Sequence, residues 1–199
     1  MMSEPGYRTH RYVLHPDKNW SHVADLAEEL GWPLVHQQPR DQSQGLDGQM
    51  IWQSDGGVSV HYVVDVTAGI GYITLAGPDA DVVSPFASRA VAALSPWRLD
   101  ELFQRFDEET DPVERGRLAL RLGLAAPPEA TNGCIERIEE VLSDKDARVR
   151  LAGLWAVTYT GYEEFVDVVQ RMAQEDPESM IRARAESIVT AFSVAGGEE

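Results

Sequence analysis

The sequence predicts an α+β domain, an antiparallel sheet with two helices over residues 1–95, followed by an all-α solenoid of about three helical hairpins over residues 96–199. Two observations carry this prediction. Before Ser95, short segments alternate apolar and polar side chains with period two, which is typical of strands. After Pro96, an aspartate followed six residues later by an arginine recurs three times, which is typical of a helical repeat. Pro96 is therefore the expected boundary.

The N-terminal elements are expected in the order strand, helix, three strands and helix. "YRTHRYVLH" alternates enough for a first strand, and "WSHVADLAEELGW" places its apolar side chains on one helical face that ends at Gly31. The polar stretch 36–49 has no apolar period and is expected to be a loop. "MIWQS", "VSVHYVVDV" and "GYITLAG" are separated by short glycine-bearing turns, which predicts an antiparallel meander. Ser84 and Pro85 are expected to begin the second helix.

One of these strands carries residue types that are found in hydrolytic enzymes. In "VSVHYVVD" the side chains of Ser59, His61 and Asp65 point to one face, and a hydroxyl, an imidazole and a carboxylate are the parts of a nucleophilic triad. On a flat strand at about 3.3 Å per residue, however, these positions lie about 7 and 20 Å apart, too far for three groups in mutual contact. The three residues are expected to form a solvent-facing row, and no catalytic residue is assigned.

The second half of the chain repeats. Three segments begin with an aspartate and carry an arginine six residues later, and the leading aspartates are 33 and 32 residues apart, within the period range of helical solenoids. Aspartate accepts hydrogen bonds from the free N–H groups of a first helical turn, so each is expected to begin a helix. An amphipathic segment precedes each aspartate and supplies the partner helix of a hairpin. The aspartate and arginine pairs are Asp111 and Arg117, Asp144 and Arg150, and Asp176 and Arg182.

This pattern of an apolar helix, a turn with aspartate and a second helix with "RVR" at 148–150 or "MIR" at 180–182 resembles the HEAT-repeat family over about residues 96–194. The resemblance implies a ladder in which the arginine of one unit pairs with an aspartate of its own or the next unit. The first unit departs from the pattern, because Gly116 stands at the β-branched position and the loop 122–133 is longer than compact connectors. The ladder residues implied are Asp111, Arg117, Asp144, Arg150, Asp176 and Arg182.

Three aromatic residues are the candidates for binding a partner. Trp155 and Tyr159 lie four residues apart on one helix, with Tyr162 just beyond, and they occupy a different face from Val149 and Ala156. Solenoids bind partners on their inner surface, and aromatic side chains are common anchors there. The alternative is that these side chains pack on the next repeat or on the N-terminal domain.

The charge of the chain restricts its partners. Its formal net charge is −16, with 5 basic against 11 acidic residues up to Ser95 and 12 against 22 beyond it. Nucleic acids are bound largely through neutralised phosphates, and the sequence shows no basic stripe, so a nucleic-acid partner is not expected. An acidic surface attracts basic proteins, although the same charge also simply keeps a protein in solution.

Metals, cofactors, disulfides and membranes are not indicated either. The single cysteine, Cys134, excludes an intrachain disulfide and gives no pair of metal ligands, which favours the cytoplasm. The five histidines form no HxH, HxxxH or HExxH motif, so no metal site is expected. No apolar run approaches the roughly 18 residues that a membrane-spanning helix needs.

These features predict a non-enzymatic, acidic protein that binds another protein and acts by scaffolding or occlusion. Its acidity and size suggest an immunity-type inhibitor of a basic protein. Two other classes stay open. One is a DNA-repair glycosylase of the HEAT-like type, which needs a cationic groove, and the other is a regulatory or lyase-associated module acting on a bound cofactor, for which the sequence holds no ligand residues.

Overall fold

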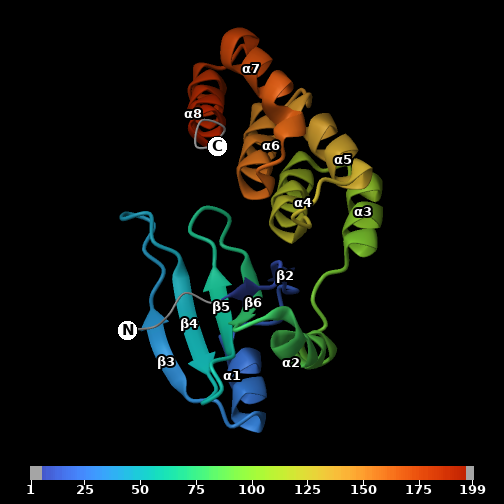
Figure 1. Cartoon of the computed structure of the whole chain (residues 1–199). Coiled ribbons are helices and arrows are strands. Elements are labelled where there is room, and N and C mark those ends of the chain that lie inside the picture. Colours follow the sequence, from blue (N-terminus) through green and yellow to red (C-terminus); the bar gives the residue numbers. More distant parts are fainter. Residues whose placement is uncertain (1–5, 196–199) are drawn as a thin grey trace. The chain divides into compact units, whose positions relative to one another are not determined.

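The computed structural model describes residues 6–195, and its chain divides into two compact units, residues 1–97 and 98–199 (Figure 1). The first unit holds an antiparallel sheet with two helices, and the second holds stacked pairs of helices, so the predicted fold class is confirmed. The division falls between Trp97 and Arg98, close to the boundary that the sequence placed at Pro96.

The sheet of the N-terminal unit has the strand order β1-β6-β5-β4-β3, and β2 also pairs with β6. The central strands β4, β5 and β6 form the predicted meander. Its two turns contain Gly57 and Gly69, whose φ angles of 80° and 67° are readily adopted only by glycine. The elements of this unit are β1 (Tyr7–Arg8), β2 (Tyr12–Val13), α1 (Trp20–Glu29), β3 (Leu34–Gln38), β4 (Gly48–Gln53), β5 (Ser59–Val64), β6 (Gly71–Gly77) and α2 (Ala80–Leu94).

Two predictions for this unit are wrong in detail. The expected loop over 36–49 begins with the end of β3, a five-residue edge strand whose side chains are mostly exposed and therefore show no apolar alternation. The second helix begins at Ala80 rather than at Ser84, because Asp79 caps it by accepting a hydrogen bond from the N–H of Val82 at 2.9 Å. Pro85 then lies inside the first turns of α2.

The two helices of this unit cover one face of the sheet. Val60, Tyr62 and Leu75 point from β5 and β6 into a core to which α1 contributes Val23 and α2 contributes Leu94. α1 begins at a capping box, in which the side chain of Asn19 accepts a hydrogen bond from the N–H of Ser21 at 2.9 Å. The core therefore has the alternation that the sequence of β5 predicts, with Val60 and Tyr62 inward.

The C-terminal unit is a stack of helical hairpins in two layers. Figure 1 shows α4, α6 and α8 side by side in one layer, with α3, α5 and α7 forming the other. The loop between α4 and α5 spans only 126–131, since α4 runs on to Ala125, so this connection is compact. The elements are α3 (Leu99–Glu108), α4 (Pro112–Ala125), α5 (Asn132–Leu142), α6 (Ala147–Thr160), the short 3₁₀ helix η1 (Glu163–Phe165), α7 (Val166–Glu175) and α8 (Ser179–Ala195). No helix of the described residues is long and apolar enough to cross a membrane.

The helices α4 and α6 approach each other closely at Gly123. A Cβ atom placed there would lie 2.6 Å from the Cα of Ala156 and 2.9 Å from its carbonyl oxygen, which belong to the backbone of α6. At Gly116, on the same helix, a Cβ atom would lie 3.5 Å from the Cβ of Ala152, which is an ordinary contact. Only Gly123 is therefore required by the packing of these two helices.

We expect Gly123→Ala to lower the free energy of unfolding of the C-terminal unit by roughly 2 kcal/mol or more, because the α6 backbone must shift to admit the methyl group. Gly116→Ala is the matched control and should be neutral or stabilising by up to about 1 kcal/mol, since alanine is the better helix former. Urea unfolding followed by helical circular dichroism measures both. Equal losses in the two variants would contradict the close approach.

Candidate functional site

The turns that enter α6 and α8 share one arrangement of aspartate and arginine. The carboxylates of Asp144 and Asp176 each accept a hydrogen bond from the backbone N–H two residues later, at 2.7 and 2.9 Å. The arginine six residues after each aspartate then donates to that aspartate's carbonyl oxygen, Arg150 to Asp144 and Arg182 to Asp176. These aspartates therefore organise the turn before the helix. The N-cap of α6 is Asp146, two residues after the expected one.

Arg150 also reaches forward to the next hairpin. Its Nε donates to Oδ2 of Asp176 at 2.7 Å and its Nη2 donates to Oδ1 at 2.9 Å, a bidentate pair whose side chains are 10% and 4% exposed. Burial by itself raises the pKa of Asp176, but hydrogen bonds from Arg150 and from the N–H of Glu178, with the charge of Arg150, outweigh it and hold the pKa below its ordinary value. Both groups are thus charged, and the pair joins two consecutive hairpins.

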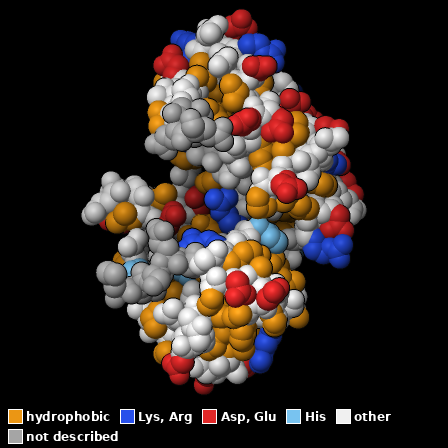
Figure 2. Space-filling view, viewed as in Figure 1, with side chains coloured by type: hydrophobic (Ala, Val, Ile, Leu, Met, Phe, Trp, Pro, Cys, Tyr) orange, Lys and Arg blue, Asp and Glu red, His pale blue; other side chains and the backbone are white. Residues whose placement is uncertain are grey.

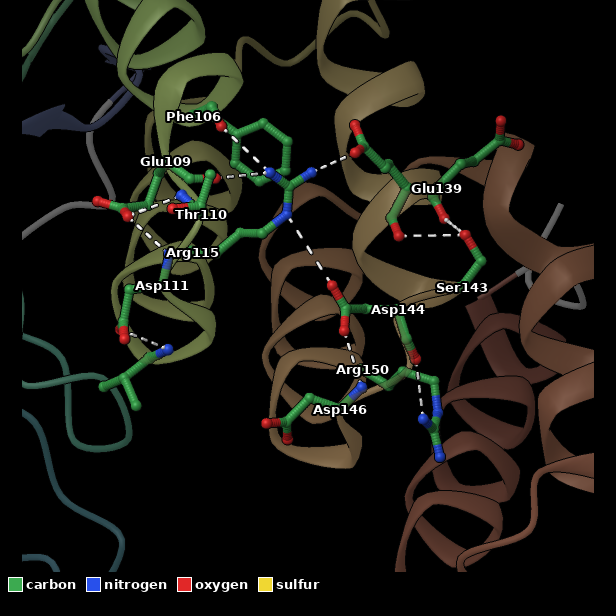
Figure 3. Close-up of polar contacts among 12 residues, drawn as sticks. Phe106, Glu109, Thr110, Asp111, Arg115, Glu139, Ser143, Asp144, Asp146 and Arg150 are labelled. Carbon is green, nitrogen blue, oxygen red and sulfur yellow. Dashed lines mark hydrogen bonds and ion pairs between the residues drawn. The ribbon is translucent and has the colours of Figure 1, made fainter.

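In the first hairpin the corresponding residues are Glu109 and Arg115. A carboxylate oxygen of Glu109 accepts hydrogen bonds from the N–H groups of Thr110 and Asp111, both at 2.8 Å. Arg115, six residues after Glu109, donates to the carbonyl oxygens of Glu109 and Phe106 and reaches forward to Asp144, with 4.0 Å between Nε and Oδ2 (Figure 3). Arg115 also pairs with the Glu140 carboxylate of α5.

Asp111 and Arg117 therefore lie outside this arrangement. Asp111 is the N-cap of α4 and accepts hydrogen bonds from the N–H groups of Val113 and Glu114, both at 3.0 Å. Arg117 pairs with Glu114 of its own helix at an exposed position. The leading acidic residues are thus Glu109, Asp144 and Asp176, with spacings of 35 and 32 residues. The Asp-Pro dipeptide at 111–112 resembles the start of the other repeats and so favours the wrong register. A pattern of any acidic residue six positions before an arginine also includes Glu109 and Arg115.

The three aromatic candidates lie in different environments. The ring centroids of Trp155 and Tyr159 are 6.4 Å apart on α6, and both side chains are partly exposed. Tyr162 is 4% exposed, stacks on Phe165 and donates from its hydroxyl to the carbonyl oxygen of Pro127 at 2.6 Å. Tyr162 therefore packs inside the unit, against Phe165 and the loop between α4 and α5, while Trp155 and Tyr159 lie on its surface.

Sequence reasoning missed Arg184, which completes this surface from α8. Its guanidinium carbon lies 3.6 Å from the centroid of the Trp155 ring, and its Nη2 donates to Oγ1 of Thr158 at 2.9 Å. A cation stacked on indole at this distance is an attractive contact that fixes both side chains. The cation and its indole lie 29 residues apart in the chain, so no local pattern pairs them.

A groove of about 250 Å³ runs between α6 and α8 beside this stacked pair. It is lined chiefly by apolar atoms, and Arg184 and Thr158 are at its polar edge. A hollow of this size is smaller than a typical pocket for a drug-sized ligand and accommodates one apolar side chain. The lining residues are Val157, Thr158, Gly161, Arg184, Ser187, Ile188, Ala191 and Phe192.

The expected solvent-facing row on β5 is wrong. Ser59, His61 and Asp65 are all buried, and Oγ of Ser59 lies 2.9 Å from Nε2 of His61 in a hydrogen bond. The imidazole is long enough to bridge the two-residue step along the strand. Asp65 instead accepts a hydrogen bond from the N–H of Ala68 in the turn after β5. Among the described residues, Nδ1 of His61 has no hydrogen-bond partner, so none of them serves as the third member of a triad.

The remaining reactive groups do not form a centre. Cys134 lies in the core of the C-terminal unit, and burial raises the pKa of its thiol. Within residues 6–195, no three His, Cys, Asp or Glu side chains are placed to hold a metal ion together.

The fold and the ladder define the class of the C-terminal unit: an α-solenoid whose helical hairpins are joined by arginine and acidic side chains. Within the C-terminal unit, residues 99–189 match the family model for HEAT repeats. The resemblance inferred from "RVR" and "MIR" is confirmed, and the N-terminal unit stays unassigned. No curated protein and no solved structure matches the chain.

We expect Arg150→Ala to lower the free energy of unfolding of the C-terminal unit by about 3 kcal/mol, because it leaves the buried Asp176 carboxylate without its partner. Arg115→Ala should also destabilise the unit, since two carbonyl oxygens and the Glu140 carboxylate lose a donor. Arg117→Ala is the control and should cost less than about 0.5 kcal/mol, as exposed pairs do. Urea unfolding of the three variants measures this order, and a loss for Arg117→Ala as large as for Arg115→Ala would contradict the register.

The stability of the N-terminal unit should depend on pH through His61. Burial, followed by the positive charges of Arg8 and His36, lowers the pKa of His61 to about 4. The unfolded chain, with a histidine pKa of about 6.5, therefore binds the proton first, and the free energy of unfolding falls as the pH drops from about 6.5 to about 4. We expect His61→Gln to weaken this fall by roughly 1 to 2 kcal/mol between about pH 7 and about pH 4.5.

Amide hydrogen exchange along β5 at the two pH values measures this difference. Ser59→Ala, which removes the hydroxyl at Nε2 but leaves the titrating imidazole in place, is its control and should keep a fall in stability towards low pH. An unchanged slope in His61→Gln would show that His61 is not the group that titrates.

Proposed function

We propose that the protein is a non-enzymatic scaffold that binds another protein through the surface formed by Trp155, Tyr159 and Arg184 on α6 and α8. The stacking of Arg184 on Trp155 beside the groove supports this proposal most directly. An indole and a guanidinium held against each other lose little side-chain entropy on binding, and tryptophan, tyrosine and arginine are the residues enriched in binding hot spots. The family model for HEAT repeats matches residues 99–189, and stacked helical repeats present extended surfaces for binding.

The charge of the chain supports a basic partner. The formal net charge is −16, and Figure 2 shows Asp and Glu side chains spread over the visible face of the helical unit, with Lys and Arg among them. Such a surface accelerates encounter with a cationic protein by electrostatic steering. In this proposal the protein acts in the cytoplasm as an immunity-type inhibitor, which covers the active cleft of a basic protein and needs no cofactor. The same charge disfavours a nucleic-acid partner and hence a DNA-repair glycosylase.

Capture of partners from cell extract tests the proposal. Immobilised wild-type protein should retain proteins of high isoelectric point at low salt and release them as salt is raised, because the attraction is partly electrostatic. Trp155→Ala should reduce the retained amount by about tenfold or more, the usual effect of removing an aromatic hot spot. A parallel gel-shift assay with duplex DNA at low salt should show no complex.

Trp20→Ala is the matched control, since Trp20 is 52% exposed but belongs to the N-terminal unit. This variant should retain the same proteins as the wild type. Retention that is lost in Trp20→Ala and kept in Trp155→Ala would move the site to the other unit. A clear complex with DNA would instead support the glycosylase class.

A further inference from the structure

Among residues 6–195, Arg184 has no acidic partner, although the chain has 33 acidic residues against 17 lysines and arginines. Among the described residues it contacts the Trp155 ring and the hydroxyl of Thr158 and interacts electrostatically with Tyr159, and none of these three is an acidic side chain. Other arginines of the same unit are paired with carboxylates: Arg115 with Glu140, and Arg137 with Asp107. The position of Arg184 thus leaves a positive charge uncompensated at the edge of an apolar groove.

The guanidinium of Arg184 is partly withdrawn from water and incompletely hydrogen-bonded. Its Nε is buried with no acceptor, and its Nη2 donates to Thr158. Burial lowers the pKa of Arg184, which means that its surroundings disfavour the positive charge, but an arginine stays protonated. The Nη1 group makes no hydrogen bond within the described residues and is not among their buried unpartnered atoms, so it is open to solvent. An anion bound there would meet a charge that water solvates poorly.

The groove next to this charge is apolar and small. Val157 forms one wall from α6, and Ile188, Ala191 and Phe192 form the other from α8. Its volume of about 250 Å³ is large enough to admit a large aliphatic side chain. Ile188 lies one helical turn beyond Arg184, so the charged and apolar parts of the site are about 5 to 6 Å apart along α8.

We propose that this groove binds the C-terminal residue of the partner polypeptide, with its terminal carboxylate on Arg184 and a large apolar side chain between α6 and α8. A terminal residue carries both groups on one Cα atom, and this matches a cation and an apolar hollow one helical turn apart. An internal aspartate or glutamate would need a second residue to fill the groove. The inference rests on the proposed function, since it assumes that the ligand is a protein.

The net charge of the chain adds a condition on the rest of that tail. The net charge of −16 repels further carboxylates, so the residues before the terminal one should be neutral or basic. The expected ligand therefore combines one terminal carboxylate with a neutral or basic segment before it, which agrees with the basic partner proposed above.

Two peptides that differ only at the C-terminus test the inference: acetyl-Lys-Lys-Ala-Leu with a free carboxylate and the same peptide as its amide. Titration followed by NMR should shift the Nε–H signal of Arg184 and the amides of α6 and α8 in a saturable way. We expect the free acid to bind at least about tenfold more tightly than the amide, as hydrogen bonds to charged groups contribute. Equal binding of the two peptides would overturn the proposal.

Two variants test the two halves of the site. Arg184→Gln keeps a donor for Thr158 but removes the charge, and Ala191→Phe fills the groove while Arg184 stays in place. Each should weaken binding of the free acid by about tenfold or more, whereas Arg117→Gln, at an exposed position on α4, should leave it unchanged. The helical circular dichroism of each variant is recorded first, so that a loss of binding is read only in folded protein.

Two further outcomes separate the inference from the proposed function. If a blocked peptide with an internal aspartate, acetyl-Lys-Asp-Leu-Ala-amide, binds as tightly as the free acid, the occupant is a side-chain carboxylate and the C-terminal assignment falls. If Trp155→Ala abolishes capture of basic proteins while Arg184→Gln does not, the groove inference falls and the proposed function stands. If the free-acid peptide binds but no protein is captured from extract, the proposed function falls and the preference of the groove for a terminal carboxylate stands.

Discussion

The contact that the C-terminal unit depends on most is the bidentate pair between Arg150 and Asp176. It is buried, and it joins the turn of one hairpin to the turn of the next. Two hydrophobic hairpins stacked face to face are free to slide or rotate relative to each other, because apolar contact is not directional. A planar guanidinium on a carboxylate has one geometry, so the pair fixes the register at which the apolar faces meet. At the preceding junction, Arg115 and Asp144 bridge the hairpins whose helices α4 and α6 approach closely at Gly123 and Ala156.

The sequence predicted the architecture because both periodicities are carried by residues close together in the chain. It did not predict the register of the first repeat, because the local signal of Asp111, a strong N-cap followed by proline, matched the signal of Asp144 and Asp176. The structure shows that these two aspartates precede the helix, and that Glu109 is their counterpart. Aspartate serves in both roles, as the N-cap of a helix and as the residue that organises the turn before a helix, so the sequence alone does not distinguish them.

Other differences come from contacts between distant residues. The side chains of the edge strand β3 are mostly exposed, so its sequence shows no alternation of apolar and polar residues. The strand is defined by its pairing with β4. Arg184 is an ordinary arginine in the sequence and acquires its role only when α8 lies against α6. For Ser59 and His61, the distance between Cα atoms along the strand overestimates the separation of the side chains, which meet in a hydrogen bond.

The ladder also has a direction along the chain. Arg115 reaches to Asp144 and Arg150 to Asp176, so each arginine serves the hairpin that follows its own. Arg182, in the last hairpin, holds the carbonyl oxygens of Asp176 and Pro177 and so repeats the backward half of this arrangement. In-frame duplication of one such segment would therefore supply both a donor and an acceptor at the new junction. A solenoid of this kind can lengthen by gene-segment duplication, because the added hairpin reuses the existing interface.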